Sequence, residues 1–294
     1  MKSRFTYPPI SISHGRLTVG MLPPPVKQLP READWSRFRV MSADGQRRVH
    51  PVEAGICAIV HRTANGIFKF VGTGFFIGVN GLLATARHNI DGDDFRLNDG
   101  DIWCRALYFG DARTRILHRD IIAAALHAES DLALAATVPI NFDSRQPLTR
   151  TPIHVMTSTI PATGSHIHTC GFPKTAVENR DDGAFGVSFM PAYYEGRISE
   201  FLPTGRPKLR GPCFQTSMTA HQGSSGGPVF DERGRVIGVV SRGWDLPDEE
   251  ESLSYVTSIR PLLDMVLPLP LKDGRRITVR ELAALDNAAI MDDQ

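Results

Sequence analysis

The sequence predicts an all-β protein, folded as a sandwich or a barrel. From Gly55 onward, short runs of β-branched and aromatic residues follow one another at near-regular spacing. Helical periodicity is found only near the carboxyl end, and many short strands with few helices are typical of sandwiches and barrels. Turn dipeptides that favour hairpins separate several of the runs: Asn65-Gly66, Asn80-Gly81, Asp99-Gly100 and Asp182-Gly183.

The strands fall into two sets, so we expect two lobes, one over 51–145 and one over 146–268. The polar, turn-rich stretch NFDSRQPLTRTP (141–152) separates them. The first set comprises ICAIVH (56–61), FKFVGTGFFIG (68–78), LLATA (82–86), WCRALYF (103–109), RTRILH (113–118) and LALAATV (132–138). The second comprises HIHTCGF (166–172), YYEGRISEF (193–201), CFQTSM (213–218), GPVFD (227–231), RVIGVVS (235–241) and LSYVTSI (253–259).

The two ends of the chain differ from the lobes. Residues 1–50 contain MLPPPVKQLP (21–30), whose prolines exclude helix and central strand, and predict an extended arm. PLLDMVL (261–267) carries a proline at an early helical position, and residues 269–294 predict a helical tail. Within that tail, Thr278 and Glu281 form a capping box, which would start a helix that places Leu282, Leu285 and Ala289 on one face.

Composition limits the cellular compartments and the classes of binding partner that we expect. A net charge of +1 predicts neither a nucleic-acid footprint nor an electrostatic membrane anchor. No apolar run approaches the roughly 18 residues that span a bilayer, and the first residues lack the apolar core of a secretory signal. We therefore expect a cytoplasmic protein. The four cysteines form no CxxC pair, which favours buried free thiols and predicts no metal and no cofactor: Cys57, Cys104, Cys170 and Cys213.

The stretch QGSSGGPVF (222–230) raises the question of a serine nucleophile. A serine hydroxyl needs a base to take its proton and a third group to hold that base. His88 directly follows the apolar run LLATA, and Asp131 directly precedes another apolar run. Each of the three candidates therefore lies at the edge of a predicted strand, in the order His88, Asp131, Ser225.

These motifs resemble the chymotrypsin-like serine peptidases, with the HtrA-like bacterial branch as the closest match. TARHN, SDLAL and GSSGGP carry the resemblance, and Gln215-Thr216, GTGFFI (72–77), PATGSHIHTCGFP (161–173) and GVVSRG (238–243) extend it over roughly residues 53–265. The resemblance implies two six-stranded antiparallel Greek-key barrels and a serine endopeptidase that acts on protein or peptide substrates.

The resemblance also implies the role of each residue. Ser225 would be the nucleophile, His88 the general base and then acid, and Asp131 the group that orients the imidazole. The N–H groups of Gly223 and Ser225 would form the oxyanion hole. Ser241, Arg242 and Gly243 would pair with the substrate main chain as an added strand.

Substrate selection is implied by the positions just before the nucleophile. Thr219 matches the floor of the specificity pocket and carries no charge, which favours a small or medium P1 side chain. His221 and Gln222 would line the substrate-binding loop. The acidic segment DLPDEEES (245–252) would lie near the pocket mouth, where a solvated turn and an attraction for basic substrates are both consistent with it.

Several positions depart from the family pattern. Ser224 stands where zymogen-activated members have an aspartate, so we expect activity that does not depend on cleavage at the N-terminus. Asn89 and His221 stand where many digestive members have cysteines, which fits a reducing compartment. His166, His168 and Cys170 alternate along one strand, but their spacing is not a zinc pattern.

Two further interpretations remain open at this point. One is a binding or regulatory protein that keeps the double barrel but has lost efficient catalysis, with Ser224 and Arg87 as its signs. The other is a peptidase that stays latent until a protein partner orders the oxyanion loop, with the proline arm and the C-terminal helix as partner surfaces. About 27 residues follow Leu267, too few for the PDZ domain that HtrA-like enzymes usually carry.

Overall fold

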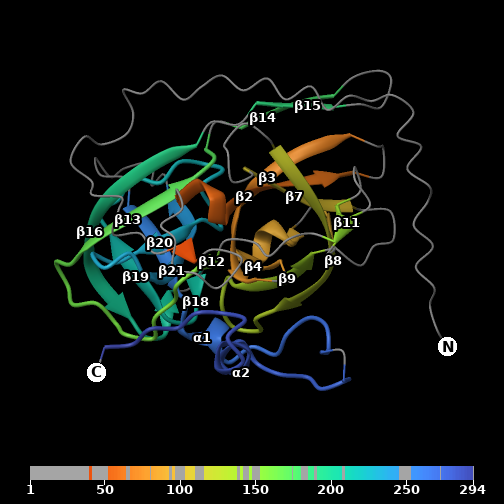
Figure 1. The fold of residues 1–294 in the computed structure, drawn as a ribbon. Coiled ribbons are helices and arrows are strands. Elements are labelled where there is room, and N and C mark those ends of the chain that lie inside the picture. The colour runs from red at the N-terminus through yellow and green to blue at the C-terminus, as the bar shows by residue number, and fades with distance from the viewer. Residues whose placement is uncertain are drawn as a thin grey trace.

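A computed structural model gives the fold of the chain (Figure 1). It describes residues 40–41 and 52–293, except for 64–66, 80, 93–94, 97–102, 110–115, 138–139, 142–145, 148–152, 174, 180–184, 189–190, 207–208, 245–252 and 272. The proline-containing arm, apart from Val40–Met41, and the acidic segment 245–252 therefore lie outside the described residues.

The first lobe is a closed antiparallel barrel of six strands, in the spatial order β2-β3-β4-β9-β8-β7. Hairpins join β2 to β3, β3 to β4, β7 to β8 and β8 to β9, while β4 pairs with β9 across the sequence. The strands are β2 (Ile56–Arg62), β3 (Phe68–Gly78), β4 (Leu82–Thr85), β7 (Trp103–Phe109), β8 (Ile116–Leu126) and β9 (Ala133–Thr137).

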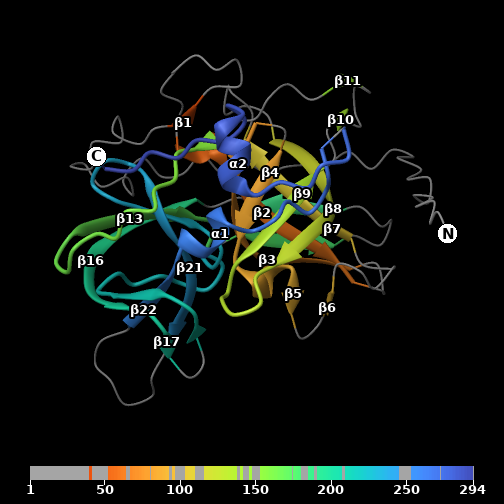
Figure 2. The same cartoon turned by 90° about the horizontal axis from the view of Figure 1, so that it is seen from below.

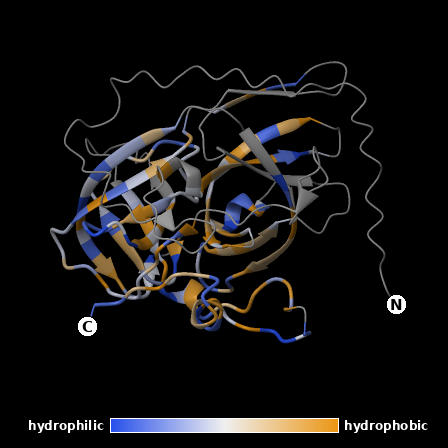
Figure 3. Cartoon of the chain, in the orientation of Figure 1, coloured by the Kyte–Doolittle hydropathy of each residue, from blue (hydrophilic) through white to orange (hydrophobic). Residues whose placement is uncertain are grey.

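The second lobe is also a closed six-stranded antiparallel barrel, ordered β13-β16-β19-β22-β21-β20. Among the residues of β16 only Ile198 is buried, and this strand is correspondingly hydrophilic along much of its length in Figure 3. The strands are β13 (His166–Gly171), β16 (Ala192–Leu202), β19 (Cys213–Thr216), β20 (Pro228–Phe230), β21 (Val236–Trp244) and β22 (Leu253–Ser258). The predicted fold class, two six-stranded barrels, is confirmed.

Outside the two barrels lie several two-stranded antiparallel sheets. They pair β1 with β12, β5 with β6, β10 with β11, β14 with β15 and β17 with β18. Their bounds are β1 (Val40–Met41), β5 (Asp91–Gly92), β6 (Phe95–Arg96), β10 (Ile140–Asn141), β11 (Gln146–Pro147), β12 (Ile153–His154), β14 (Ala176–Asn179), β15 (Phe185–Ser188), β17 (Gly205–Arg206) and β18 (Leu209–Arg210).

The largest difference from the predicted strands is in β8. The run RTRILH was expected to end at residue 118, but β8 continues through the alanine-rich segment to Leu126. Alanine has a weak preference for strands, so the segment lacked a strand signal. Pairing with β7 on one side and with β9 on the other overrides that local preference.

The helical end of the chain lies at the seam between the barrels (Figure 2). α1 (Arg260–Leu263) is only one turn long, and α2 (Val279–Ala284) begins with the predicted capping box of Thr278 and Glu281. Because α2 ends at Ala284, both Leu285 and Ala289 lie outside the helix, and Leu285 is exposed. The expected helical face shared by Leu282, Leu285 and Ala289 is therefore wrong. None of the described helices is long and apolar enough to cross a membrane.

The segment after α2 forms hydrogen bonds with both the first barrel and the connection between the lobes. Asn287 accepts a hydrogen bond from Val79 N–H of the first barrel, at 3.0 Å. Two residues on, Ala289 accepts one from Met156 N–H in the inter-lobe connection, at 2.8 Å. The predicted partner surface at the C-terminal helix is thus partly used within the molecule.

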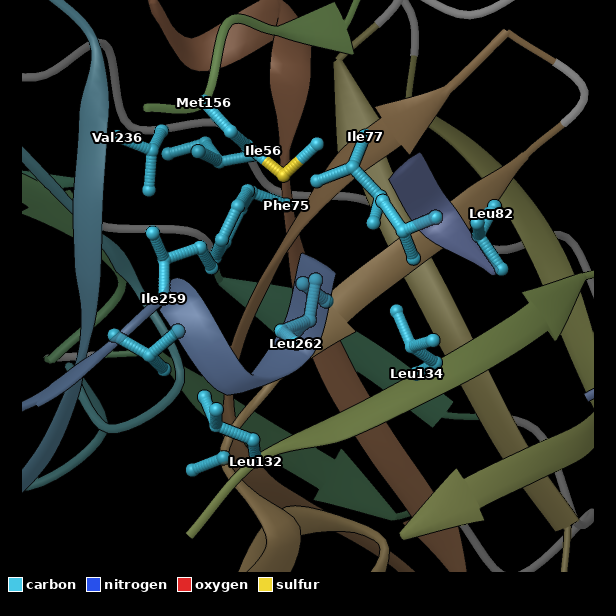
Figure 4. Packing of buried hydrophobic residues seen from close by; sticks show 14 of the residues in the cluster. Ile56, Phe75, Ile77, Leu82, Leu132, Leu134, Met156, Val236, Ile259 and Leu262 are labelled. Carbon is cyan, nitrogen blue, oxygen red and sulfur yellow. The ribbon is translucent and has the colours of Figure 1, made fainter. Parts of the chain in front are cut away.

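The largest apolar cluster fills the space between the barrels. Figure 4 shows Leu262 of α1 and Ile259 packed near Phe75 of β3 and Met156 of the connection, with Val236 of β21 beside them. All of these side chains are fully buried. Burial on this scale holds the two barrels in a fixed relation, and that relation positions the residues of the candidate site.

Candidate active site

His88 lies on a one-turn 3₁₀ helix, Arg87–Asn89, directly after β4. β4 is buried at all four residues, so the turn emerges from the barrel wall at a fixed point. The His88 side chain is 30% exposed, which leaves one edge of the ring open to solvent. The prediction that this histidine lies at a strand end is confirmed.

Asp131 lies in the loop between β8 and β9. His127 Nδ1 is in contact with Ser130 Oγ at 2.7 Å, and it accepts a hydrogen bond from Glu129 N–H at 3.2 Å. Arg87, next to His88, donates from Nη1 to His127 O at 2.9 Å. The loop that holds the acid is therefore attached to the turn that holds the histidine.

The two side chains meet in a bidentate contact. His88 Nδ1 lies 3.0 Å from Asp131 Oδ1 and 2.9 Å from Oδ2, and His88 N–H donates to Oδ1 at 3.1 Å. A carboxylate at Nδ1 places the proton on that nitrogen and leaves Nε2 as the acceptor. Burial alone would raise the pKa of Asp131, but the hydrogen bonds and charge of His88 and the hydrogen bond from Ser241 hold it below its ordinary value.

Ser225 joins this pair through Ser241. Its Oγ donates to the main-chain carbonyl of Ser241 at 2.8 Å, and Ser241 Oγ donates to Asp131 Oδ2. The three predicted residues, from two barrels, thus belong to one hydrogen-bonded chain. Among the residues that the structure describes, Ser225 and His88 share no hydrogen bond.

The loop before Ser225 has an unusual backbone at Gly223. Its φ of +93° is disfavoured for residues with a side chain, and a Cβ there would lie 2.7 Å from the ring of Phe70. Within the described part of the chain, the N–H groups of Gly223 and Ser225 donate to no protein acceptor.

The predicted specificity residues lie around this loop. Thr219, His221 and Gln222 are exposed. The His221 ring meets Tyr194 edge-on, at 5.5 Å between centroids. Sequence reasoning missed Ser254, a buried residue of β22 whose Oγ accepts a hydrogen bond from Ala220 N–H at 2.9 Å. It carried no signal in the sequence, because it reaches the loop only through the pairing of β22 in the barrel.

The segment Ser241–Gly243 lies in β21, where it extends beyond the part of that strand paired with β20. Arg242 and Gly243 pair with Tyr255 and Ser254 of β22 on one edge. Of these three residues only Ser241 has a described side chain, and it is buried on Asp131.

The comparisons with known proteins agree with this architecture. The trypsin-like peptidase domain matches residues 72–239, which is more than half of the chain. Among curated proteins, none matches significantly.

Solved structures of similar fold include proteases. Deg5 is 19% identical with a TM-score of 0.52, over 74% of this chain and 89% of that one. The active form of the Rv3671c protease from M. tuberculosis is 20% identical with a TM-score of 0.49, over 72% and 80%. The MamO protease domain from Magnetospirillum magneticum is 14% identical with a TM-score of 0.48, over 73% and 96%.

Two closed antiparallel barrels, with a histidine–carboxylate pair on one and a serine in a glycine-rich loop on the other, define the class of chymotrypsin-like hydrolases. The chain belongs to the trypsin-like peptidase family, as the resemblance in the sequence predicted, and it is a serine endopeptidase.

Proposed function

We propose that this endopeptidase hydrolyses peptide bonds through Ser225, His88 and Asp131 by way of an acyl-enzyme. The observation that carries the proposal is the contact of His88 Nδ1 with Asp131, at 2.9 Å. It leaves Nε2 unprotonated and able to take the Ser225 proton during attack. The same ring then donates that proton to the leaving amine, while the Asp131 carboxylate stabilises the imidazolium.

The first step would be a rotation of the nucleophile. Ser225 Oγ lies on the carbonyl of Ser241, the group that would accept the N–H of a substrate residue if the substrate pairs with this segment as an added strand. A bound peptide would displace the hydroxyl from that carbonyl and release it toward His88. Binding and activation of the nucleophile would then be coupled.

Charge that develops on the carbonyl oxygen would be stabilised by the N–H groups of Gly223 and Ser225. Both belong to the loop that holds the nucleophile, and neither donates to another described residue. Donors that are already oriented cost no reorganisation in the transition state, and removal of one such donor typically slows turnover about 10²–10³-fold.

The substrate would be a peptide read mainly through its backbone, with a small or medium P1 side chain. Thr219 offers no carboxylate for lysine or arginine. Ser254 of β22 accepts a hydrogen bond from Ala220 N–H and so places a polar, uncharged group beside the segment that carries Thr219. We assign His221 and Gln222, which are exposed next to it, to the rim of this pocket.

We further propose an intracellular bacterial enzyme that needs no N-terminal cleavage. Ser224 occupies the position where a carboxylate would capture a new ammonium, and this serine is fully buried. Cys57, Cys170 and Cys213 are buried free thiols, as in proteins of a reducing compartment.

A second candidate is a protein of the same fold that acts by binding, or that becomes active only with a partner. The position of Ser225 Oγ on Ser241, away from a hydrogen bond with His88, is the observation that favours it. In that case the nucleophile would remain on the carbonyl until a partner shifts the loop.

A fluorophosphonate probe separates these candidates. Labelling of the wild-type chain and loss of labelling in Ser225→Ala support the triad, and Ser224→Ala provides the matched control because it removes the neighbouring hydroxyl. A folded wild-type chain that takes up no probe, alone and with a peptide mixture present, would exclude a competent triad and support the binding protein.

A further inference from the structure

Thr73 is a residue of the first barrel whose hydroxyl lies between two segments of the second. It belongs to β3 and is fully buried. Its Oγ1 donates to Gly223 O at 2.8 Å and accepts from Phe172 N–H at 3.1 Å. One hydroxyl therefore joins the nucleophile loop to the end of β13 across the interface between the barrels.

The main chain of Thr73 makes a second set of contacts to the same loop. Thr73 N–H donates to Ser225 O at 2.8 Å, and Asn89 Nδ2 donates to the same carbonyl at 2.9 Å. Thr85 Oγ1 donates to Thr73 O at 2.7 Å and thereby holds β3 in place. Both residues that flank Ser224 thus have their carbonyls held by the first barrel.

Close packing leaves little freedom for this arrangement. Gly226, with φ of +87°, approaches so closely that a Cβ there would lie 2.0 Å from Thr73 O and 2.3 Å from Thr85 Oγ1. Asn89 takes the space in front of Gly72, where a Cβ would lie 2.4 Å from Asn89 Nδ2. The polar groups are therefore enclosed, and an unpaired one would be costly.

The contact at Gly223 determines the orientation of a peptide plane. The plane between Gly223 and Ser224 is held at its carbonyl by Thr73 Oγ1 and at its N–H by His221 O, at 3.0 Å. The N–H of Gly223 belongs to the preceding peptide plane, which is joined to this one through the φ and ψ of Gly223, so a fixed plane between Gly223 and Ser224 limits the directions that this N–H can take. The Thr73 hydroxyl supplies that constraint from the opposite barrel.

We propose that Thr73 is a positioning residue for the nucleophile loop, the segment that carries Gly223 and Ser225. It sets the direction of the Gly223 N–H and so affects the transition state more than substrate binding. The inference rests on the proposed function, in which this N–H stabilises the oxyanion. A hydroxyl is required at position 73, but the methyl group of threonine is not.

Two substitutions separate the hydroxyl from the shape of the side chain. Thr73→Val keeps the volume and removes the donor to Gly223 O and the acceptor of Phe172 N–H. Thr73→Ser keeps both hydrogen bonds and removes a methyl group. Thr137→Val is the matched control, because the buried Thr137 Oγ1 also donates to a carbonyl at 2.8 Å, that of Gly81 in the first barrel.

Steady-state cleavage of a peptide substrate measures the effect. We expect Thr73→Val to lower kcat about 10–100-fold with KM changed less than about 3-fold, since a misdirected oxyanion donor weakens only the transition state. We expect Thr73→Ser and Thr137→Val to retain kcat within about 3-fold. Equal kcat in Thr73→Val and Thr73→Ser would overturn the inference, as would an effect confined to KM.

Amide hydrogen exchange tests the same inference without catalysis. In Thr73→Val we expect the N–H groups of Phe172 and Ser224 to exchange faster, with unchanged protection of the β20–β21 ladder. If the wild-type chain takes up no fluorophosphonate, the proposed function fails and the catalytic part of the inference fails with it, while this measurement still decides whether Thr73 holds the loop. Unchanged protection of Phe172 and Ser224 in a folded Thr73→Val chain would overturn it.

Discussion

His154 should make the free energy of unfolding of this protein fall strongly at acidic pH. It lies in β12, in the connection between the barrels, and is fully buried between Phe75 and Phe230, with ring centroids at 6.0 and 5.1 Å. Neither ring nitrogen has a hydrogen-bond partner among the described atoms. Burial lowers the pKa of His154 to about 3, although the nearby backbone of Gly55 favours the protonated ring and opposes the shift.

The magnitude follows from the difference between the two states. An unfolded histidine binds a proton below about pH 6.5, whereas folded His154 stays neutral down to about pH 3. The unfolded state therefore gains protons first as the pH falls, and stability is lost over that window. This single group should lower the free energy of unfolding by about 2 kcal/mol at pH 5 and by about 3 kcal/mol at pH 4.

Urea unfolding at pH 8 and pH 5 measures this loss. Because other groups also titrate, the comparison is between wild type and His154→Leu, which offers no proton site. We expect the fall in stability between the two pH values to be smaller by about 2 kcal/mol in His154→Leu. His166→Asn, which removes an exposed histidine of β13, is the control for the loss of a histidine. An identical pH dependence in wild type and His154→Leu would refute the assignment of a neutral, buried imidazole.

The remaining predictions concern the site, the thiols and one helix. Asp131→Asn should lower kcat about 10⁴-fold at neutral pH, measured by peptide cleavage. The amide would favour the His88 tautomer with its proton on Nε2, which cannot accept a proton from Ser225. A loss below about 10-fold would contradict the triad. Added reductant should leave the unfolding temperature unchanged in a thermal melt, since Cys57, Cys170 and Cys213 are free thiols; a lowered midpoint would reveal a disulfide. Thr278→Ala should destabilise the chain by about 1 kcal/mol in urea unfolding through loss of the capping box, and Thr63→Ala, at a partly exposed threonine outside any helix, should cost less.

Much of the fold was predictable because its signals are local. The run FKFVGTGFFIG became β3 with the same bounds, and WCRALYF became β7. Gly81, the second residue of a predicted hairpin turn, has a φ of +88°, as its residue type predicted. Local preferences did not predict the alanine-rich end of β8, because it becomes a strand through pairing with neighbouring strands rather than through its own residue types.

The site divides in a similar way. The order of His88, Asp131 and Ser225 and their strand-edge positions could be predicted from motifs. Thr73 and Asn89 could not be predicted as partners of the nucleophile loop. The hydroxyl of Thr73 contacts a carbonyl 150 positions away, and the Asn89 amide contacts one 136 positions away.

The sequence by itself determined where most of the barrel strands lie and which residue types are available for acyl transfer. Only the tertiary structure decided where the Ser225 hydroxyl points, which groups hold the Gly223 carbonyl and that His154 is enclosed between two aromatic rings. The physical reason is range. Strand and turn preferences act over a few residues, whereas hydrogen bonds and burial between the barrels exist only once both are closed and packed together.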